Sequence, residues 1–182
     1  TLCFSLWTGA PVRVGFDNPE SHPFLTLPVA AAPGEPMLEN LRRLLSPFGK
    51  TAPLRPRLVP SDFSRRAAAD VVGQGLPPVI IFAPSHWRKS WPLAAFLRLA
   101  GALTAHGHRV FLAFGPGDAR LEDPAVREWV DGSRGLGATL PPQSPSVWIA
   151  MLAGCALFIS NDCGPYHLAA AAGARCIAAF LS

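Results

Sequence analysis

Short apolar segments alternate with helix-like segments through the second half of the chain, and this alternation most restricts the fold. The apolar segments cover residues 79–83, 110–114, 156–160 and 176–180. Such short, nearly continuous apolar runs are typical of strands that are buried on both faces of a parallel sheet. Strands that alternate with helices through short loops imply right-handed crossovers and helices on both faces. The pattern predicts an α/β fold with a Rossmann-like parallel sheet.

Helix boundaries between these strands are marked by proline, serine and glycine. Pro92 begins the first helix and Gly107 ends it. A more polar helix is expected over Ala119 to Val130, with no strong strand pattern after it. Ser144–Pro145 and Pro165 begin two further helices. Because each strand leads through a loop into a helix N-terminus, we expect a ligand at the carboxyl ends of the strands.

The first 60 residues follow a different pattern. They contain one strand-like segment, Val12–Phe16, and one amphipathic segment, Met37–Phe48, within irregular, proline-rich chain. These elements are too few to close a core of their own, so residues 1–60 are expected to be the end of an N-terminal domain and its linker. Residues 61–182, which begin with a helix capped by Ser61, are expected to form a C-terminal domain that is truncated at a strand. The sequence is therefore interpreted as a fragment.

Composition and charge exclude several classes of protein. The 182 residues are 49% hydrophobic and 15% charged, which excludes a disordered, charge-rich chain. The net charge of +4 comes from scattered basic residues, so we expect general attraction for anions and no nucleic-acid partner. No apolar stretch free of proline is long enough to span a membrane, and no signal peptide is visible. The four cysteines show no metal-binding spacing, which indicates reduced thiols in a cytoplasmic protein.

The segment from Phe158 to Gly173 is the strongest functional pattern, because it reads as a strand, a tight turn and an alanine-rich helix. Backbone N–H groups around Cys163 and Gly164 would point out of a helix N-terminus, where phosphate binds, and glycine permits close approach. Asp162 would repel phosphate, so we expect it to accept hydrogen bonds from sugar hydroxyls. The residues alone leave a second interpretation equally open, in which Asp162 only caps the helix and His167 packs in its first turn.

A second segment that suits anions follows the first strand of this half, over residues 84–92. It places Arg88 and Lys89 beside a helix N-terminus. Lys89 is a flexible point charge, which suits a diphosphate whose negative charge grows as it leaves. Taken alone, the segment would be interpreted as a solvated surface loop. Two anion-suited loops on the same edge of one sheet favour a phosphate site instead.

Together these segments resemble glycosyltransferase family 9, the ADP-heptose:lipopolysaccharide heptosyltransferases. Lys89–Pro92 matches a Lys-x-Trp-Pro segment of that family, and Asn161–Ala171 matches its Asn-Asp-Ser/Thr-Gly-x-x-His-x-Ala-Ala-Ala segment. Gly15–Asp17 and the helix around residues 41–49 are similar to the end of the family's N-terminal domain. Cys163 stands where the family has Ser or Thr, so a weak thiol donor replaces a hydroxyl.

The resemblance implies a GT-B fold, of which this chain would supply the C-terminal, nucleotide-sugar-binding half and the tail of the N-terminal domain. It implies an inverting, metal-independent transfer of heptose from ADP-heptose to the lipopolysaccharide inner core, with the ADP-sugar as donor substrate and no cofactor. Lys89 would stabilise the leaving diphosphate, and the general base would lie in the N-terminal region that this sequence lacks. The resemblance assigns donor binding to six residues: Ser85, Lys89, Asp162, Cys163, Gly164 and His167.

Two other functions remain open from the sequence. The chain is then either a non-catalytic nucleotide-binding domain or part of a GT-B transferase that uses another NDP-sugar. The acceptor is expected to be the lipopolysaccharide core or another glycan. A cytoplasmic location is expected, and the resemblance leaves open a peripheral contact with the inner membrane. The fragment alone is not expected to transfer sugar, because acceptor site and base are both missing.

Overall fold

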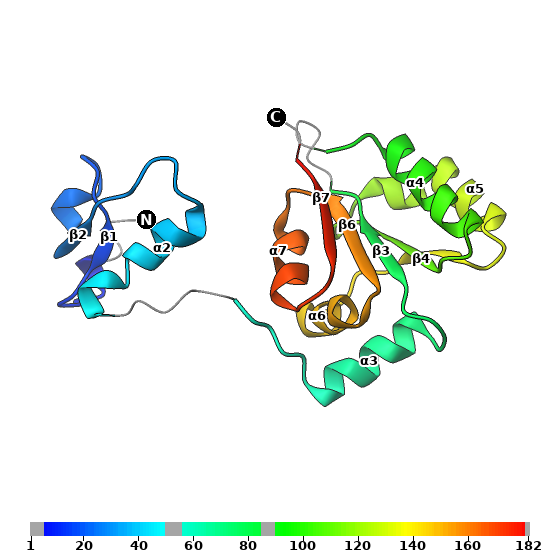
Figure 1. Cartoon of the computed structure of the whole chain (residues 1–182), viewed down its shortest axis with the longest axis horizontal. Coiled ribbons are helices and arrows are strands. Elements are labelled where there is room, and N and C mark those ends of the chain that lie inside the picture. Colours follow the sequence, from blue (N-terminus) through cyan, green and yellow to red (C-terminus); the bar gives the residue numbers. More distant parts are fainter. Residues whose placement is uncertain (1–5, 50–55, 85–89, 181–182) are drawn as a thin grey trace. The chain divides into compact units, whose positions relative to one another are not determined.

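The computed structural model describes residues 6–49, 56–84 and 90–180. It divides the chain into two compact units, residues 1–55 and residues 56–182 (Figure 1). The sequence placed the domain boundary after residue 60. Each unit is described by itself below.

The described part of the first unit includes five short elements with defined bounds: β1 (Val14–Phe16), η1 (His22–Phe24), β2 (Leu27–Val29), α2 (Met37–Arg43) and η2 (Ser46–Phe48). β1 pairs in parallel with β2, a strand that sequence analysis missed because it is short and contains a proline. The helix expected over 37–48 is divided into α2 and η2. Pro47 has no N–H to bond the carbonyl of Arg43, and the hydroxyl of Ser46 donates to that carbonyl instead, at 2.7 Å.

The second unit is built on a five-stranded sheet. All neighbouring strands pair in parallel, in the order β5-β4-β3-β6-β7. Numbered from β3, this order is 3-2-1-4-5, the doubly wound order of a Rossmann-like sheet, which confirms the predicted fold class. The elements of the unit are α3 (Asp62–Val72), β3 (Val79–Phe82), α4 (Leu93–Ala105), β4 (Val110–Ala113), η3 (Ala119–Glu122), α5 (Pro124–Gly132), β5 (Gly137–Leu140), α6 (Pro145–Gly154), β6 (Leu157–Asn161), α7 (Gly164–Ala171) and β7 (Cys176–Ala179).

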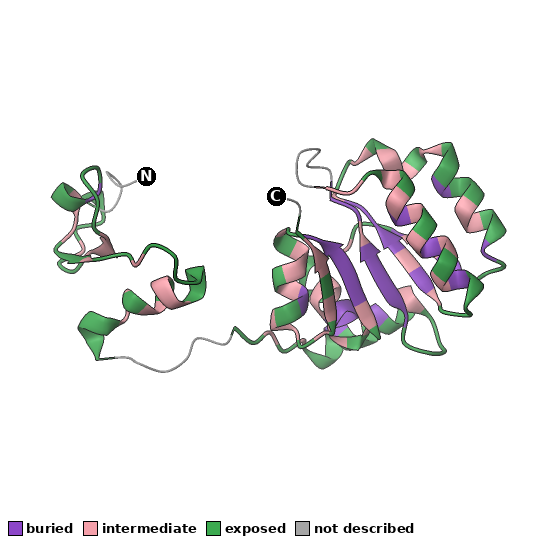
Figure 2. Ribbon diagram, turned by 45° about the horizontal axis from the view of Figure 1, so that its top comes forward, coloured by how far each residue is buried: buried purple, intermediate pink, exposed green. Residues whose placement is uncertain are grey.

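Helices cover both faces of the sheet, and its central strands are buried (Figure 2). Successive side chains of a strand point to opposite faces. Val79 and Ile81 of β3 therefore pack in the core cluster that includes α4 and α5 residues. Ile80 packs in the other cluster, which includes residues of α3, α6 and α7. Both Ile80 and Ile81 are fully buried, so β3 is the centre of the core.

Two expectations for this unit were wrong. The helix expected over 119–130 is divided into η3 and α5, because Asp123 caps α5 and Pro124 begins it. The strand β5 was missed, because a short segment that begins with glycine carries little strand signal. Gly137 is needed there for packing, since a Cβ at this position would lie 2.7 Å from the Trp129 side chain.

Candidate functional site

The chain reverses its winding direction between β3 and β6. From β3 it continues to β4 and β5 on one side of the sheet, and from β6 it continues to β7 on the other. In open α/β sheets, ligands bind outside the carboxyl ends of the strands at such a switch point. There, β3 leads through residues 83–92 into α4, and β6 leads through residues 162–163 into α7. The described residues that flank these two connections therefore lie side by side, since Phe82 pairs with Ser160 and Trp91 bonds to Asn161.

The turn between β6 and α7 and the first residues of α7 hold four of the six predicted donor-binding residues. Asp162 Oδ1 lies 3.5 Å from Nε2 of His167, which belongs to α7. The side chain of His167 contacts the ring of Tyr166 with centroids 5.3 Å apart, yet it is 70% exposed, and that of Asp162 is 43% exposed. The N-cap residue of α7 is Cys163 rather than Asp162. Asp162 therefore does not cap α7, and both side chains are accessible to a ligand.

Gly164 is not required by the packing of the described residues. A Cβ built on Gly164 would meet no described atom within 4 Å, and its φ lies outside the left-handed region. Neither the fold nor the backbone conformation therefore demands glycine at this position. The open space beside its backbone leaves room for a ligand to approach the N–H groups of α7.

Three helices of the second unit begin without a side-chain cap. Within the described part of the chain, the N-cap residues Pro92 of α4, Ser144 of α6 and Cys163 of α7 make no capping hydrogen bond through a side chain. Ser61 and Asp123, by contrast, cap α3 and α5. The first-turn N–H groups of an α-helix carry a partial positive charge. The uncapped termini therefore present hydrogen-bond donors that suit an anion.

Ser85 and Lys89, the predicted donor-binding residues of the other loop, lie outside the described residues. The chain before this segment is fixed at Ala83, whose N–H donates to a β4-end carbonyl at 3.0 Å. The chain after it is fixed at Trp91, whose ring packs against Phe96 of α4 with centroids 5.7 Å apart. Both flanking residues are anchored to the core of the second unit.

Asn161, the last residue of β6, belongs to the motif found in the sequence, but sequence analysis gave it no role at the site. Its side chain is fully buried. Its Oδ1 accepts a hydrogen bond from the N–H of Trp91 at 3.0 Å, and its Nδ2 donates to the carbonyl of Ala179 at 2.9 Å. The amide therefore joins the end of β6 to the chain after β3 and to the end of β7. A signal for it existed, because a polar residue at the end of an apolar strand requires buried partners.

Arg120 forms a second link at this edge that the sequence did not reveal. Its guanidinium binds both carboxylate oxygens of Asp118, with Nε at 3.0 Å and Nη2 at 2.6 Å, and Nη2 also donates to Ala83 O at 2.9 Å. The hydrogen bond from Arg120 lowers the pKa of Asp118, whose side chain is only 7% exposed, so this carboxylate is ionised at neutral pH. The pair fixes the loop after β4 against the end of β3.

An apolar cavity of about 240 Å³ opens near the carboxyl ends of β3, β4 and β5. Trp148 of α6 forms one wall and contacts the Phe82 ring, with centroids 6.3 Å apart. Cavities that enclose a drug-sized ligand are larger, about 300–1,000 Å³, so this one suits a single flat ring of a larger ligand. The remaining apolar walls include Phe114, Leu140, Pro165 and Leu168.

Neither the other thiols nor the His, Asp and Glu side chains of the described residues form a second site. Burial raises the pKa of the Cys155 thiol to about 12 and also raises the pKa of Cys176, so both are neutral thiols at neutral pH. Among residues 6–49, 56–84 and 90–180, no group of three or more His, Cys, Asp or Glu side chains is placed to hold a metal ion. In the same ranges, every helix is too short or too polar to cross a membrane.

Comparison with known families gives one match over nearly the entire chain. The sequence model of glycosyltransferase family 9 (heptosyltransferase) matches residues 3–182. No curated protein sequence matches the chain significantly.

Solved structures of similar fold include proteins from Escherichia coli and Veillonella parvula. Escherichia coli heptosyltransferase WaaC with ADP-2-deoxy-2-fluoro heptose matches with a TM-score of 0.71 at 20% identity, over 98% of this chain and 58% of that chain. A family 9 glycosyl transferase from Veillonella parvula DSM 2008 matches with a TM-score of 0.79 at 21% identity, over 98% and 53%. Escherichia coli ADP-heptose lps heptosyltransferase II matches with a TM-score of 0.70 at 19% identity, over 98% and 59%. The chain thus spans little more than half the length of these proteins.

Proposed function

The chain belongs to glycosyltransferase family 9, and we propose that it is the donor-binding half of a heptosyltransferase that uses ADP-heptose. The observation that carries the proposal is the β6–α7 turn at the switch point. There the backbone beside Gly164 is open, and Asp162 and His167 are accessible. The fold-related WaaC from Escherichia coli, solved with ADP and with a fluorinated ADP-heptose, supports this choice of ligand.

In this proposal the three parts of the donor contact three parts of the site. The diphosphate lies against the N–H groups of Cys163 and Gly164, at the uncapped N-terminus of α7. Asp162 accepts hydrogen bonds from sugar hydroxyls, and His167 beside it helps to hold the donor. The nucleobase enters the apolar cavity and packs against Trp148.

Transfer then proceeds by a single displacement. An acceptor hydroxyl oxygen forms a bond to the anomeric carbon while the bond from that carbon to the diphosphate oxygen breaks, so the configuration inverts and ADP leaves with the electron pair. Lys89, with Ser85 near it, stabilises the growing negative charge, so neither a metal ion nor a cofactor is required. A general base takes the proton of the hydroxyl, and we assign that role to no residue of this chain. The acceptor is the lipopolysaccharide inner core or another glycan, and transfer takes place in the cytoplasm.

Calorimetric titration of ADP in the presence of EDTA tests the donor site. We expect the chain to bind ADP without a divalent metal. Gly164→Ala should leave the stability unchanged, because the added methyl contacts no described atom. It should weaken ADP binding about tenfold or more, which corresponds to about 1.4 kcal/mol. Gly101→Ala in α4 is the matched control, since its Cβ would also meet open space but away from the turn.

Several results would contradict the proposal. ADP that binds only with added Mg²⁺ or Mn²⁺ would exclude the metal-independent site. Equal affinity of the Gly164→Ala and Gly101→Ala variants would place the nucleotide elsewhere. Tighter binding of UDP or GDP than of ADP would favour a GT-B transferase with another NDP-sugar. ADP binding combined with no transfer by the complete protein would favour a non-catalytic nucleotide-binding domain.

A further inference from the structure

Asn161 makes its two side-chain hydrogen bonds to backbone segments that are distant in the sequence. Trp91, which donates to Oδ1, is 70 residues away, and Ala179, which accepts from Nδ2, is 18 residues away. Asn161 is fully buried, so each bond satisfies a polar group that water does not reach. Both functional ends of the amide are used, and the side chain is therefore held in one orientation.

The position of Asn161 in the sheet explains why a side chain is needed for this link. On the β7 side, Asn161 is the last residue in register and pairs with Ala179. On the β3 side, the register ends one residue earlier, at the pair Phe82–Ser160. The chain leaves β3 after that pair and returns at Trp91, just before α4. The amide of Asn161 thus continues the connection between the two segments beyond the end of the strand pairing.

We propose that Asn161 is a positioning residue that holds the N-terminus of α4 beside the β6–α7 turn, so that two helix N-termini act on one diphosphate. This inference rests on the proposed function. Asn161 directly precedes Asp162, and its partner Trp91 directly precedes Pro92, the N-cap residue of α4. One buried side chain therefore joins the end of β6 directly to the residue that precedes the N-cap of α4.

Electrostatics explain why this position matters for the ligand. Each helix N-terminus acts as about half a positive charge, and its effect is confined to the first turn. The attraction of two such termini for one diphosphate depends on their distance from it. Within the described residues, neither α4 nor α7 has a capping side chain to compete with the ligand. Loss of the Asn161 link should therefore weaken binding of the diphosphate more than a substitution elsewhere that costs the same stability.

The test combines a local probe with a binding measurement on Asn161→Ala. The local probe is the hydrogen-exchange rate of the Trp91 amide in the ligand-free protein, measured by NMR with ¹⁵N-tryptophan. We expect Asn161→Ala to remove its protection and to weaken ADP binding about tenfold, the effect of one buried hydrogen bond. If this variant does not fold, Asn161→Ser retains a polar group but is too short to reach Trp91, and the same result is expected.

Thr104→Val is the matched control. Thr104 is also buried, but its hydroxyl bonds only within α4, to the carbonyls of Ala100 and Gly101 at 3.1 and 3.0 Å. This variant should lose stability, keep the Trp91 amide protected and bind ADP as the parent does.

Each remaining outcome contradicts a stated part of the inference. Parent-like ADP affinity in the Asn161 variant, despite a released Trp91 amide, would overturn the positioning role. Equal weakening in Thr104→Val would show that Asn161 acts only through stability. A parent chain that binds no ADP would overturn the proposed function and this inference together, and that failure is recognised in the unaltered protein.

Discussion

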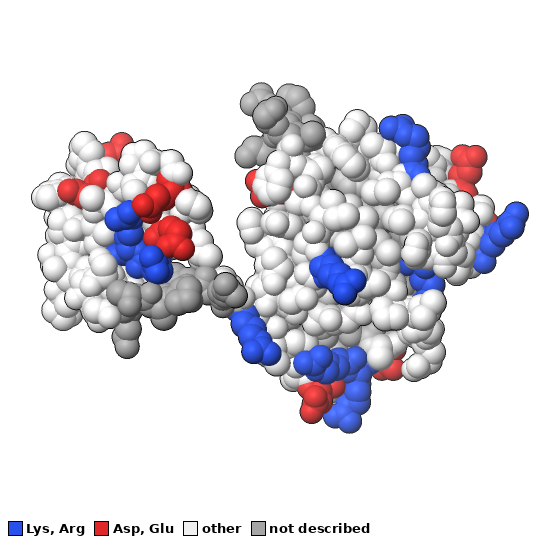
Figure 3. Space-filling model, in the orientation of Figure 1, with Lys and Arg blue, Asp and Glu red and all other residues white. Residues whose placement is uncertain are grey.

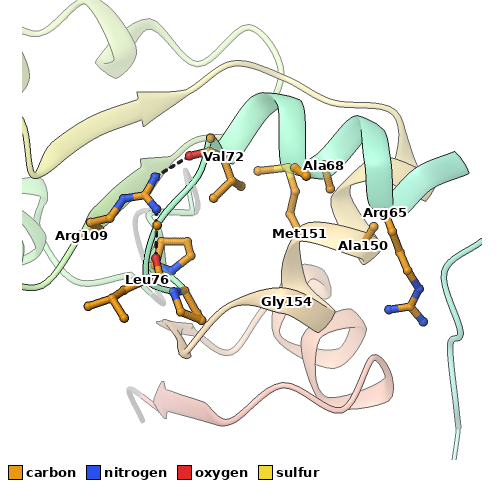
Figure 4. Close-up of a pocket in the computed structure, with 13 residues that line it drawn as sticks. Arg65, Ala68, Val72, Leu76, Arg109, Ala150, Met151 and Gly154 are labelled. Atoms are coloured by element: carbon orange, nitrogen blue, oxygen red, sulfur yellow. Dashed lines mark hydrogen bonds between the residues drawn. The ribbon is translucent and has the colours of Figure 1, made fainter. Parts of the chain in front are cut away.

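The five-stranded sheet has an amino edge, where its parallel strands begin, and a carboxyl edge, where they end. The positively charged groups at these two edges have different partners. At the amino edge, the guanidinium of Arg109 binds the carbonyl oxygens of Val72, at the end of α3, and of Leu76 (Figure 4). A cavity of about 280 Å³ lies beside it, between α3 and α6. At the carboxyl edge, α7 begins with no capping side chain among the described residues. The cation at one edge is thus occupied by the protein's own carbonyls, whereas the donors at the other remain available to a ligand.

This difference shows that neither a cavity nor a positive charge identifies the site here. The cavities at the two edges are similar in size, about 280 and 240 Å³. On the face shown in Figure 3, the Lys and Arg side chains of the second unit are scattered and form no single patch. Backbone N–H groups at helix N-termini carry no formal charge, so a charge map does not show them, yet they bind phosphate well. The topology of the sheet, rather than the net charge of +4, indicates where an anion binds.

The largest effect is expected from Lys89→Ala at the carboxyl edge. If this lysine neutralises the leaving diphosphate, its loss should raise the activation free energy of the complete transferase by about 2–4 kcal/mol. kcat/KM should fall accordingly, mostly through kcat. The measurement is steady-state transfer from ADP-heptose. Lys50→Ala, which removes the other lysine of the sequence, is the control and should behave like the parent. An unchanged kcat/KM in Lys89→Ala would show that this residue does not stabilise the leaving diphosphate.

Arg109→Ala tests the amino edge and should affect stability alone. Its loss leaves the carbonyls of Val72 and Leu76 without their charged donor, which should destabilise the protein by about 1.5–3 kcal/mol. Urea denaturation measures this change, and ADP affinity should stay at the parent value. Arg66→Ala on the exposed surface of α3 is the control, with an expected change within about 0.5 kcal/mol. A clear loss of ADP affinity in Arg109→Ala would contradict this difference between the edges and would indicate that the anion binds at the amino edge.

Most of the fold could be predicted from the sequence, but the links within the site could not. Apolar runs identified β3, β4, β6 and β7, because strands buried on both faces need them. The sequence did not predict β5, because this strand is short, begins with Gly137 and contains few β-branched residues. The turn at Gly164 was predicted from local pattern alone. Asn161 and Arg120 were missed because their partners, Trp91 and the end of β3, lie 70 and 37 residues away. Such contacts depend on strand order, which no local pattern contains.

Cys163→Ser should have the smallest effect, and it tests whether this side chain lies at the ligand on the carboxyl edge. Serine is smaller, donates a stronger hydrogen bond and suits a helix N-cap, so ADP should bind as before or more tightly, by no more than about 1 kcal/mol.

In the parent, the half-buried Cys163 should react with a thiol reagent before Cys155, because burial raises the pKa of Cys155 to about 12 and leaves little thiolate. Mass spectrometry of the labelled peptides measures both rates, with and without ADP. Bound ADP should slow the labelling of Cys163 and leave that of Cys155 unchanged. Labelling of Cys163 that is no faster than that of Cys155, or that ADP does not slow, would place this thiol beneath the turn rather than at the ligand.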